Sequence, residues 1–290
     1  MDNVECGDSL AVKQPTQSEI GGSNPASPLQ SARQLAEQRF KTNPVMCFQR
    51  HLIEASAELN PREKYPKEFL LHEGVREITR AECATFIEQY EYLGTLGRGS
   101  VYYGLFMPNG EMVGANCFCT SGGGIGNICG PEYAGKTANL ARGCCVLHAP
   151  VNAGSFFTAR SIKMAYAKYG WQVYFAYSDP NASENGKLYK ILNWYYLGAG
   201  LNHSGGHSDW YKDGNRIKSY AVFRDGGKAL VKYGYEPGTG GQWAWLRANG
   251  WEQRIDPDKG KFCWFEGNKR EVRAAKAACR YPLDLPFPEK

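Results

Sequence analysis

The stretch 173–198, VYFAYSDPNASENGKLYKILNWYYLG, limits most strongly how this chain can fold. An apolar run at Val173–Tyr177 ends in Asp179-Pro180, a polar loop with a glycine follows, and an aromatic-rich segment with helical spacing comes next. This order predicts a buried strand, a splayed loop and a helix, with polar groups where the strand stops. Open α/β folds bind ligands at such strand ends, so we expect a functional site here.

The composition is that of a globular protein. The chain has 290 residues, of which 42% are hydrophobic, enough for one large domain or a domain with appendages. Ten cysteines occur without an apolar leader at Met1–Leu10, so we expect reduced thiols in a cytoplasmic protein. No run reaches the roughly 18–20 apolar residues that a membrane span needs, so no membrane partner is expected.

Composition divides the chain into three expected parts. Residues 1–45 are rich in Ser, Pro, Gln, Gly and Asn, which predicts a mostly disordered arm with a short helix at Ala32–Phe40. Residues 46–236 alternate between strand and helix patterns and form the expected central domain. Residues 237–290 are basic and aromatic, and we expect them to be a C-terminal extension that packs on this domain.

Hydrophobic periodicity places the individual elements. The expected helices are Phe48–Leu59, Arg80–Tyr90, Ser155–Tyr169 and Asn268–Arg280, and the expected strands are Val75–Thr79, Ser100–Phe106, Met112–Thr120, Ala138–His148, Val173–Tyr177 and Ser219–Arg224. Thr79 with Glu82 predicts a capping box, and Ser155 predicts an N-cap. Because a hairpin precedes the crossover unit, the fold class is α/β (α+β) with a mixed sheet. Its central parallel pair, Leu140–Leu147 beside Val173–Tyr177, is expected to diverge and admit a ligand.

Positive charge is concentrated at the end of the chain. Residues 259–290 hold eight Lys or Arg and four Asp or Glu, which gives +4 of the net charge of +5. Such asymmetry favours a polyanionic partner, nucleic acid above all, although a solvated helix face also explains it. The side chains expected to contact nucleic acid are Lys269, Arg270, Arg273, Lys276 and Arg280.

The loop after strand Ala138–His148 has the character of an anion site. Asn152, Ala153, Gly154 and Ser155 are small or polar and stand at an expected helix N-terminus. Free backbone N–H groups and the positive end of the helix dipole favour an anionic cofactor there. An ordinary strand-to-helix loop is the alternative.

Arg142 lies in an otherwise apolar strand and needs a partner, since an unpaired buried guanidinium is costly. Asp179, at the end of the neighbouring strand, is the expected partner, in either a structural ion pair or a catalytic one. Tyr92 and Tyr189 could stack on a base or transfer a proton, with core packing as the alternative.

Other polar clusters give weaker signals. His203, His207 and Asp209 show no further strong ligand by spacing, so we predict no metal site, and a metal requirement stays open. The cysteines at 117, 119, 144 and 145 fall in strands and are expected to be core thiols. The glycine-rich segment 121–130 is expected to be a loop and is a weak phosphate-loop candidate.

Several motifs together resemble the phage Mom DNA-modification family. They are Tyr90-Glu91-Tyr92-Leu93-Gly94, Arg142, Asn152–Ser155, Tyr177-Ser178-Asp179-Pro180, Gly186–Tyr189, Asn193-Trp194 and the closing Tyr281-Pro282-x3-Pro286-x-Pro288. The resemblance covers roughly Val75–Lys290. It implies a GNAT-like fold with a mostly antiparallel sheet, a catalytic domain at 46–236, and conversion of adenine in DNA to N6-carbamoylmethyladenine, which protects phage DNA from host restriction enzymes.

The same resemblance implies the catalytic residues. Tyr92, Arg142, Asp179 and Tyr189 fall where the family keeps its essential site residues. Glu91 falls where the best-known form of the family has histidine, and a carboxylate with a raised pKa could perform the same proton transfer. Double-stranded DNA is the implied partner, together with a small or carrier-bound acyl donor.

Two other classes of function fit the same sequence. One is a GNAT N-acyltransferase that modifies a small amine or peptide with acetyl-coenzyme A. The other is a non-enzymatic DNA-binding accessory protein. The donor also stays open between acetyl-coenzyme A and an aminoacyl donor, since the usual coenzyme A signature of GNAT enzymes is not spelled out at Asn152–Ser155.

Overall fold

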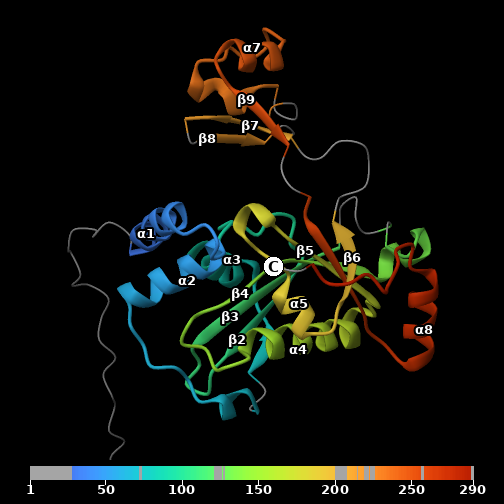
Figure 1. Cartoon of the computed structure of the whole chain (residues 1–290). Coiled ribbons are helices and arrows are strands. Elements are labelled where there is room, and N and C mark those ends of the chain that lie inside the picture. Colours follow the sequence, from blue (N-terminus) through green and yellow to red (C-terminus); the bar gives the residue numbers. More distant parts are fainter. Residues whose placement is uncertain are drawn as a thin grey trace, which may run out of the picture.

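The computed structural model describes residues 28–71, 74–120, 126, 128–199, 208–213, 215–218, 222, 226–255 and 258–288. Seven of the described strands form one sheet in the order β1-β2-β3-β4-β5-β10-β6 (Figure 1). They are β1 (Val75–Glu77), β2 (Val101–Phe106), β3 (Met112–Cys119), β4 (Thr137–Cys145), β5 (Val173–Ser178), β10 (Gly260–Phe265) and β6 (Tyr195–Ala199). Only β4 and β5 are parallel among these neighbours. The mixed, mostly antiparallel sheet expected of a GNAT-like fold is therefore confirmed.

The parallel pair diverges, as the sequence predicts. Thr137, Ala138 and Asn139 of β4 pair with three successive residues of β5, and the pairing stops there. β4 nevertheless continues to Cys145 and β5 to Ser178. Beyond Asn139 the two strands separate, which leaves space between them for other groups.

The main sheet is flanked by α2 (Phe48–Leu59), α3 (Arg80–Tyr90), α4 (Ala153–Tyr169), α5 (Lys187–Ile191) and α8 (Lys269–Ala278), with short 3-10 helices at Lys67–Leu71, Pro131–Lys136 and Pro180–Ala182. A further 3-10 helix, Lys228–Tyr233, packs with a second, smaller sheet. The predicted bounds of α2 and α3 are confirmed, and Thr79 and Glu82 form the predicted capping box. Ser155 is not the N-cap of α4, because Asn152 turns the chain into the helix with φ of 67°. The Ser155 hydroxyl instead donates to the Asn152 carbonyl.

The aromatic segment after Asp179 is a short helix and a strand rather than one helix. α5 ends at Ile191, and Asn193 has a φ of 57°, which turns the chain out of the helix. Tyr195–Ala199 then pairs with β10 as the edge strand β6. The prediction of a continuous helix is wrong because aromatic residues at helical spacing also suit a half-buried strand.

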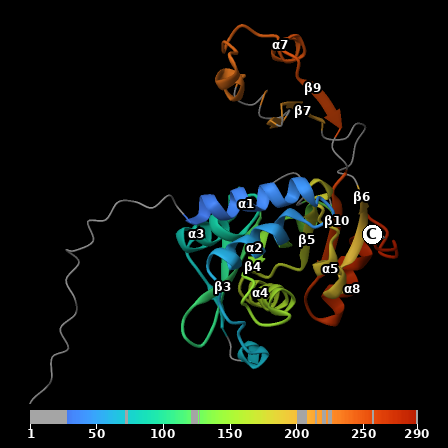
Figure 2. The same ribbon diagram turned by 60° about the vertical axis from the view of Figure 1, so that its left-hand side comes forward.

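The segment 28–42 corrects the expectation of a disordered arm. It forms α1 (Pro28–Thr42), longer than the predicted short helix, and packs along α2 (Figure 2). Ala32 and Ala36 are buried against Leu52 and Ala55, so small side chains let the two helices approach closely. This contact could not be predicted from the sequence, because the segment is mostly polar and the apolar stripe of α1 is short.

A small second sheet interrupts the chain between β6 and β10 and stands apart from the main sheet in both views (Figures 1 and 2). It consists of β8 (Asn215–Lys218), β7 (Ser208–Lys212) and β9 (Glu252–Ile255), with α7 (Gln242–Ala248) beside it. Trp210, Leu230, Leu246 and Trp251 give it a core of its own. We call this unit, residues 208–255, the inserted lobe.

The expected boundary at residue 237 is therefore wrong. Residues 237–255 belong to the inserted lobe, and β10 lies inside the main sheet between β5 and β6. The segment is not an extension packed on a finished domain, because without β10 the strand β6 has no neighbour in the sheet. Pairing between strands this distant in sequence leaves no local signal.

Some expectations lie outside the described residues, including most of the strand expected at 219–224 and most of the glycine-rich segment 121–130. The hairpin of β2 and β3 is confirmed. Cys117, Cys119 and Cys144 are buried thiols, and Cys145 is half-buried. None of the helices in the described ranges is long and apolar enough to cross a membrane.

Candidate active site

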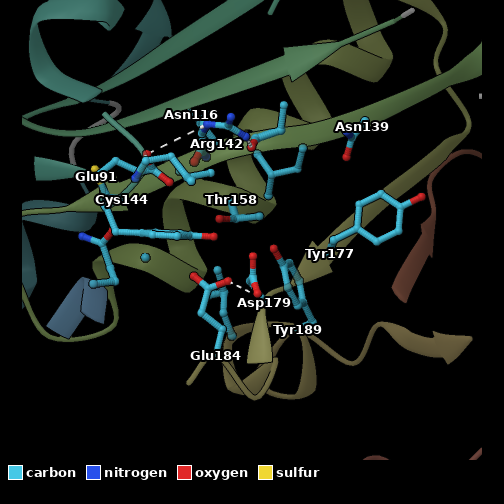
Figure 3. Close-up of a pocket in the computed structure, with 18 of the residues that line it drawn as sticks. Glu91, Asn116, Asn139, Arg142, Cys144, Thr158, Tyr177, Asp179, Glu184 and Tyr189 are labelled. Atoms are coloured by element: carbon cyan, nitrogen blue, oxygen red, sulfur yellow. Dashed lines mark hydrogen bonds and ion pairs between the residues drawn. The ribbon is translucent and has the colours of Figure 1, made fainter. Parts of the chain in front are cut away.

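A cavity of about 530 Å³ opens where β4 and β5 separate (Figure 3). The five residues predicted as catalytic all line it: Glu91, Tyr92, Arg142, Asp179 and Tyr189. They come from the end of α3, from β4, from the end of β5 and from α5. Glu91 and Arg142 lie on one side, and Asp179, Glu184 and Tyr189 face them from the other (Figure 3).

Arg142 pairs with Glu91 and not with Asp179. Its Nε lies 3.9 Å from Glu91 Oε2 and donates to the Thr95 carbonyl at 2.8 Å. Glu91 is only 4% exposed, and Oε2 also accepts from the backbone N–H groups of Leu93 and Gly94. Burial raises the pKa of Glu91, while Arg142 and the two N–H groups oppose that rise. Glu91 is thus held by a cation and by its own turn.

The turn that carries Glu91 and Tyr92 is fixed by the first two helices. Arg33 of α1 donates to the carbonyls of Tyr92 and Glu91 at 2.8 and 3.1 Å. Gln49 of α2 accepts from the Tyr92 N–H at 2.9 Å and donates to the Tyr90 carbonyl. No motif in the sequence points to these two positioning residues, because they act on backbone groups that any sequence would supply.

Asp179 has both carboxylate oxygens engaged. Oδ1 accepts from the Asn181 N–H at 3.0 Å and caps the short turn that follows β5. Oδ2 lies 2.7 Å from Nζ of Lys259, which stands just before β10. The predicted pair with Arg142 is corrected, since both Asp179 and Arg142 have nearer partners. Lys259 was counted only as part of the basic tail, and its role depends on a long-range pairing.

Glu184 is the site residue that the sequence analysis missed. It lines the cavity, and its Oε2 accepts from the Asp179 N–H at 2.9 Å. Burial raises the pKa of Glu184 to about 7, and the negative charges of Asp179 and Glu91 act in the same direction. A possible signal was its place in the polar loop after Asp179, five residues downstream.

Both predicted tyrosines are neutral phenols that line the cavity. Tyr189 stacks on Phe262 with ring centroids 4.7 Å apart and packs on Trp194 at 5.0 Å. Burial raises the pKa of Tyr189 and of Tyr92, and nearby carboxylates add to both effects. Each hydroxyl is therefore a hydrogen-bond donor at neutral pH rather than a base.

The N-terminus of α4 reaches the same cavity. Gly154 lines it, and a side chain at that position would approach only Leu188, at 3.9 Å, so the first turn of the helix is open. The Asn152 side chain makes no capping bond, and Ala153 N–H is used by the Pro150 carbonyl. Asn139, where the parallel pairing ends, has a buried Oδ1 that meets no hydrogen-bond donor among the described residues (Figure 3).

The basic helix lies elsewhere. α8 packs its Ala275 against β5 and β10, at the β6 end of the sheet (Figure 1). Lys269, Arg270, Arg273 and Arg280 are exposed, while Lys276 lies over the Tyr195 ring. None of these five predicted DNA contacts lines the cavity. The structure therefore groups the catalytic candidates in one place and the basic helix in another.

No group of three or more His, Cys, Asp or Glu side chains in the described ranges could hold a metal ion. His203 and His207 lie outside those ranges, and Asp209, the third residue of that cluster, lines the cavity.

Comparison with curated proteins gave no match. Solved structures similar to this chain include spermidine/spermine N-acetyltransferase of Vibrio cholerae, with 8% identity, a TM-score of 0.35 and coverage of 66% of this chain and 93% of that one. An acetyltransferase of Bacillus subtilis in complex with CoA has 9% identity, a TM-score of 0.34 and coverage of 67% and 98%. Ribosomal-protein-S5-alanine acetyltransferase of Vibrio fischeri has 10% identity, a TM-score of 0.35 and coverage of 67% and 93%.

The family comparison is specific. The sequence pattern of the Mom protein family matches residues 73–229, more than half of the chain. The match runs from β1 through β8 and includes all five predicted catalytic residues. This chain belongs to the Mom protein family.

Proposed function

We propose that this protein is a transferase that modifies DNA, converting adenine to N6-carbamoylmethyladenine. The observation that carries the proposal is the gathering of Glu91, Tyr92, Arg142, Asp179 and Tyr189 around one cavity. These are the residues that the Mom resemblance implies for the reaction. In a phage, this modification would protect the DNA from host restriction enzymes.

The residues around the cavity suit a reaction at the exocyclic amine of adenine. A base inside a duplex is inaccessible, so the adenine has to be flipped out before it can react. Tyr189 or Tyr92 would stack on the flipped base or donate a hydrogen bond to its edge. Arg142 would orient the donor carbonyl, and a carboxylate of the cavity would take the proton from the exocyclic amine.

The donor would enter between the diverging strands. The backbone N–H groups at Gly154 and Ser155 stand at the positive end of the α4 dipole and suit an anionic donor such as an acyl-coenzyme A or an aminoacyl ester. The unpartnered Asn139 Oδ1 would accept a hydrogen bond from an N–H group of that donor. The donor supplies the activated carbonyl carbon, and the chain's own residues hold and orient it.

Two substitutions test the assignment. Asp179→Asn should lower the yield of modified deoxyadenosine about 100-fold, because Lys259 loses its counter-ion and the turn after β5 loses its charged cap. Tyr189→Phe should lower the yield about tenfold, because it removes only a hydroxyl. The yield is measured by mass spectrometry of nucleosides from DNA of expressing cells. Tyr169→Phe, on the outer face of α4, is the matched control.

The outcomes separate the functions. A new modified deoxyadenosine in wild-type cells supports DNA modification, and full yield from both site variants would show that the residues are wrongly assigned. Unmodified DNA together with acetyl-coenzyme A binding would point to an N-acyltransferase acting on a small amine. Unmodified DNA with DNA binding alone would point to an accessory protein.

The exposed face of α8 is the proposed DNA contact. Lys269 and Arg270 stand in the first turn, where positive charge opposes the helix dipole, so helix stability does not explain them. The variant Lys269→Gln/Arg270→Gln/Arg273→Gln should bind duplex DNA about 10- to 100-fold more weakly at ~0.1 M salt. The slope of log K against log salt should fall by about 3.

Fluorescence anisotropy at several salt concentrations measures both quantities. The control is Lys41→Gln/Lys64→Gln/Lys67→Gln, which removes three exposed charges from another part of the surface. Equal losses in both variants would mean that net charge alone binds DNA and that α8 is not the contact.

A further inference from the structure

Five carboxyl groups line the cavity, those of Glu91, Asp179, Glu184, Asp209 and Asp258. Glu91 and Asp179 interact electrostatically with Glu184, and these three groups are not equivalent. Glu91 is held by Arg142 and by two backbone N–H groups. Asp179 is held by Lys259 and by the N–H of Asn181. Each of these two carboxylates is thus engaged by a cation and by backbone donors, which stabilise its charge and fix its orientation.

Glu184 differs in having no cation within ion-pair distance among the described residues. Its Oε2 accepts from the Asp179 N–H at 2.9 Å, and its own N–H donates to the Asp179 carbonyl at 3.1 Å. These two bonds lock the loop and aim the side chain into the cavity, as Figure 3 shows. Its other oxygen, Oε1, has no hydrogen-bond donor among the residues described.

The charged and titratable groups around Glu184 come from every neighbouring element. Those that interact electrostatically with it are Asp179 at the end of β5, Glu91 and Tyr92 after α3, Lys259 before β10, Tyr189 on α5 and Cys47 before α2. Of these only Lys259 is a cation, and it is paired with Asp179. Asp209 and Asp258 also line the cavity, and Arg142 and Lys259 are its only cations among the described residues, so the net charge around Glu184 is negative.

We propose that Glu184 is the catalytic base that takes the proton from the attacking amine. The inference rests on the proposed function and names the residue that accepts the proton, which the proposed function leaves open. Glu91 would then position Arg142, and Asp179 would orient Glu184 through its backbone N–H and hold Lys259.

The proton transfer fits an acyl-transfer step with an activated glycyl ester or thioester as donor, which carries all the atoms of the carbamoylmethyl group. The lone pair of the amine forms a bond to the donor's carbonyl carbon, and one N–H proton passes to Oε1 of Glu184. The bond from that carbon to the leaving oxygen or sulfur then breaks with its electron pair, and the leaving atom takes the proton from Glu184. Because burial raises the pKa of Glu184 to about 7, this side chain can both accept and return a proton near neutral pH. The product, N6-glycyladenine, is an isomer of N6-carbamoylmethyladenine. Its free amine attacks C6 of the adenine ring and the C6–N6 bond breaks, so the former N6 becomes the terminal amide nitrogen and the atoms balance.

The test compares wild type, Glu184→Gln, Glu184→Asp and the surface control Glu88→Gln. Purified protein is incubated with plasmid DNA and a deproteinised host-cell extract as the source of donor, from pH 5.5 to 8.5. The wild-type rate of modified deoxyadenosine formation should rise with pH through about 7, because the base must be ionised. Glu184→Gln should be at least 100-fold slower at pH 7.5 without this rise, Glu184→Asp should recover part of the rate, and Glu88→Gln should match wild type.

A folding measurement separates this role from a structural one. A carboxyl whose pKa is higher in the folded state stabilises the fold below its unfolded pKa, and this stability is lost as pH rises through the folded value. Glu184→Gln is neutral at every pH, so it should unfold at a higher temperature than wild type at pH 8, and this difference should shrink as the pH falls toward 5.

The experiment gives different results if the proposed function is wrong and if only the role of Glu184 is wrong. A wild type that leaves DNA unmodified overturns the proposed function. A wild type that modifies DNA while Glu184→Gln keeps its rate and pH profile overturns the role of Glu184 alone. A Glu184→Gln protein that is slow but keeps the wild-type rise through pH 7 also overturns it, because Glu184 would then be structural.

Discussion

Replacing Gly186 with alanine is expected to lower the free energy of unfolding by about 3 kcal/mol and to abolish DNA modification. Gly186 has a φ of 72°, a region that L side chains rarely adopt. A Cβ there would lie 2.1 Å from Cζ of Phe262, which is fully buried in β10. Phe262 cannot move away, since it packs against Tyr189, Tyr196 and Phe287.

The loss of activity follows from the place of this glycine. Gly186 is the N-cap of α5, the helix that contains Tyr189. Tyr189 stacks on the ring of Phe262, which the new methyl group would displace. Relief of the clash requires α5 or β10 to shift, and either movement changes the wall of the cavity. A single methyl group thus acts on the site without touching a substrate.

Gly110→Ala is the matched control. Gly110 has a φ of 84° in the β2–β3 turn, and a Cβ there meets nothing within 4 Å. Chemical denaturation should show a loss of about 1 kcal/mol for Gly110→Ala, the cost of the backbone conformation alone. Equal losses in the two variants, or full modification by Gly186→Ala, would contradict the packing argument.

The local parts of the fold could be predicted from the sequence. α2, α3 and the Thr79 capping box follow from apolar spacing and from side chains that bond within one turn. The end of β5 was also predicted, because polar residues follow an apolar run at Asp179. Each of these signals lies within a few residues of the structure it determines.

The remaining parts depend on contacts between distant segments. β10 pairs with β5 although the whole inserted lobe lies between them in the sequence, and this pairing brings Lys259 to Asp179. Arg142 could be predicted to need an anion, yet its choice of Glu91 over Asp179 depends on a turn held by Arg33 and Gln49. Glu184 carries no motif, and only its burial beside two carboxylates distinguishes it.

Replacing Arg142 with methionine is expected to lower the free energy of unfolding by about 2 to 3 kcal/mol at pH 7.5. The loss comes from Glu91, which is 4% exposed and would lose its ion-pair partner. Methionine fills a similar volume but cannot donate to the Thr95 carbonyl. DNA modification should fall at least 100-fold, since the donor carbonyl loses its orienting cation.

The double variant Arg142→Met/Glu91→Gln tests whether the charge of Glu91 causes the loss of stability in Arg142→Met. Glutamine can still accept from the N–H groups of Leu93 and Gly94, so the double variant should regain most of the lost stability while modification stays abolished. In Arg142→Met itself, the pKa of Glu91 rises further above its unfolded value. The instability should therefore lessen as pH falls and Glu91 takes up a proton. Denaturant titrations at pH 5.5 and 7.5 measure both effects, and a double variant no more stable than Arg142→Met would show that Arg142 does not hold Glu91 ionised.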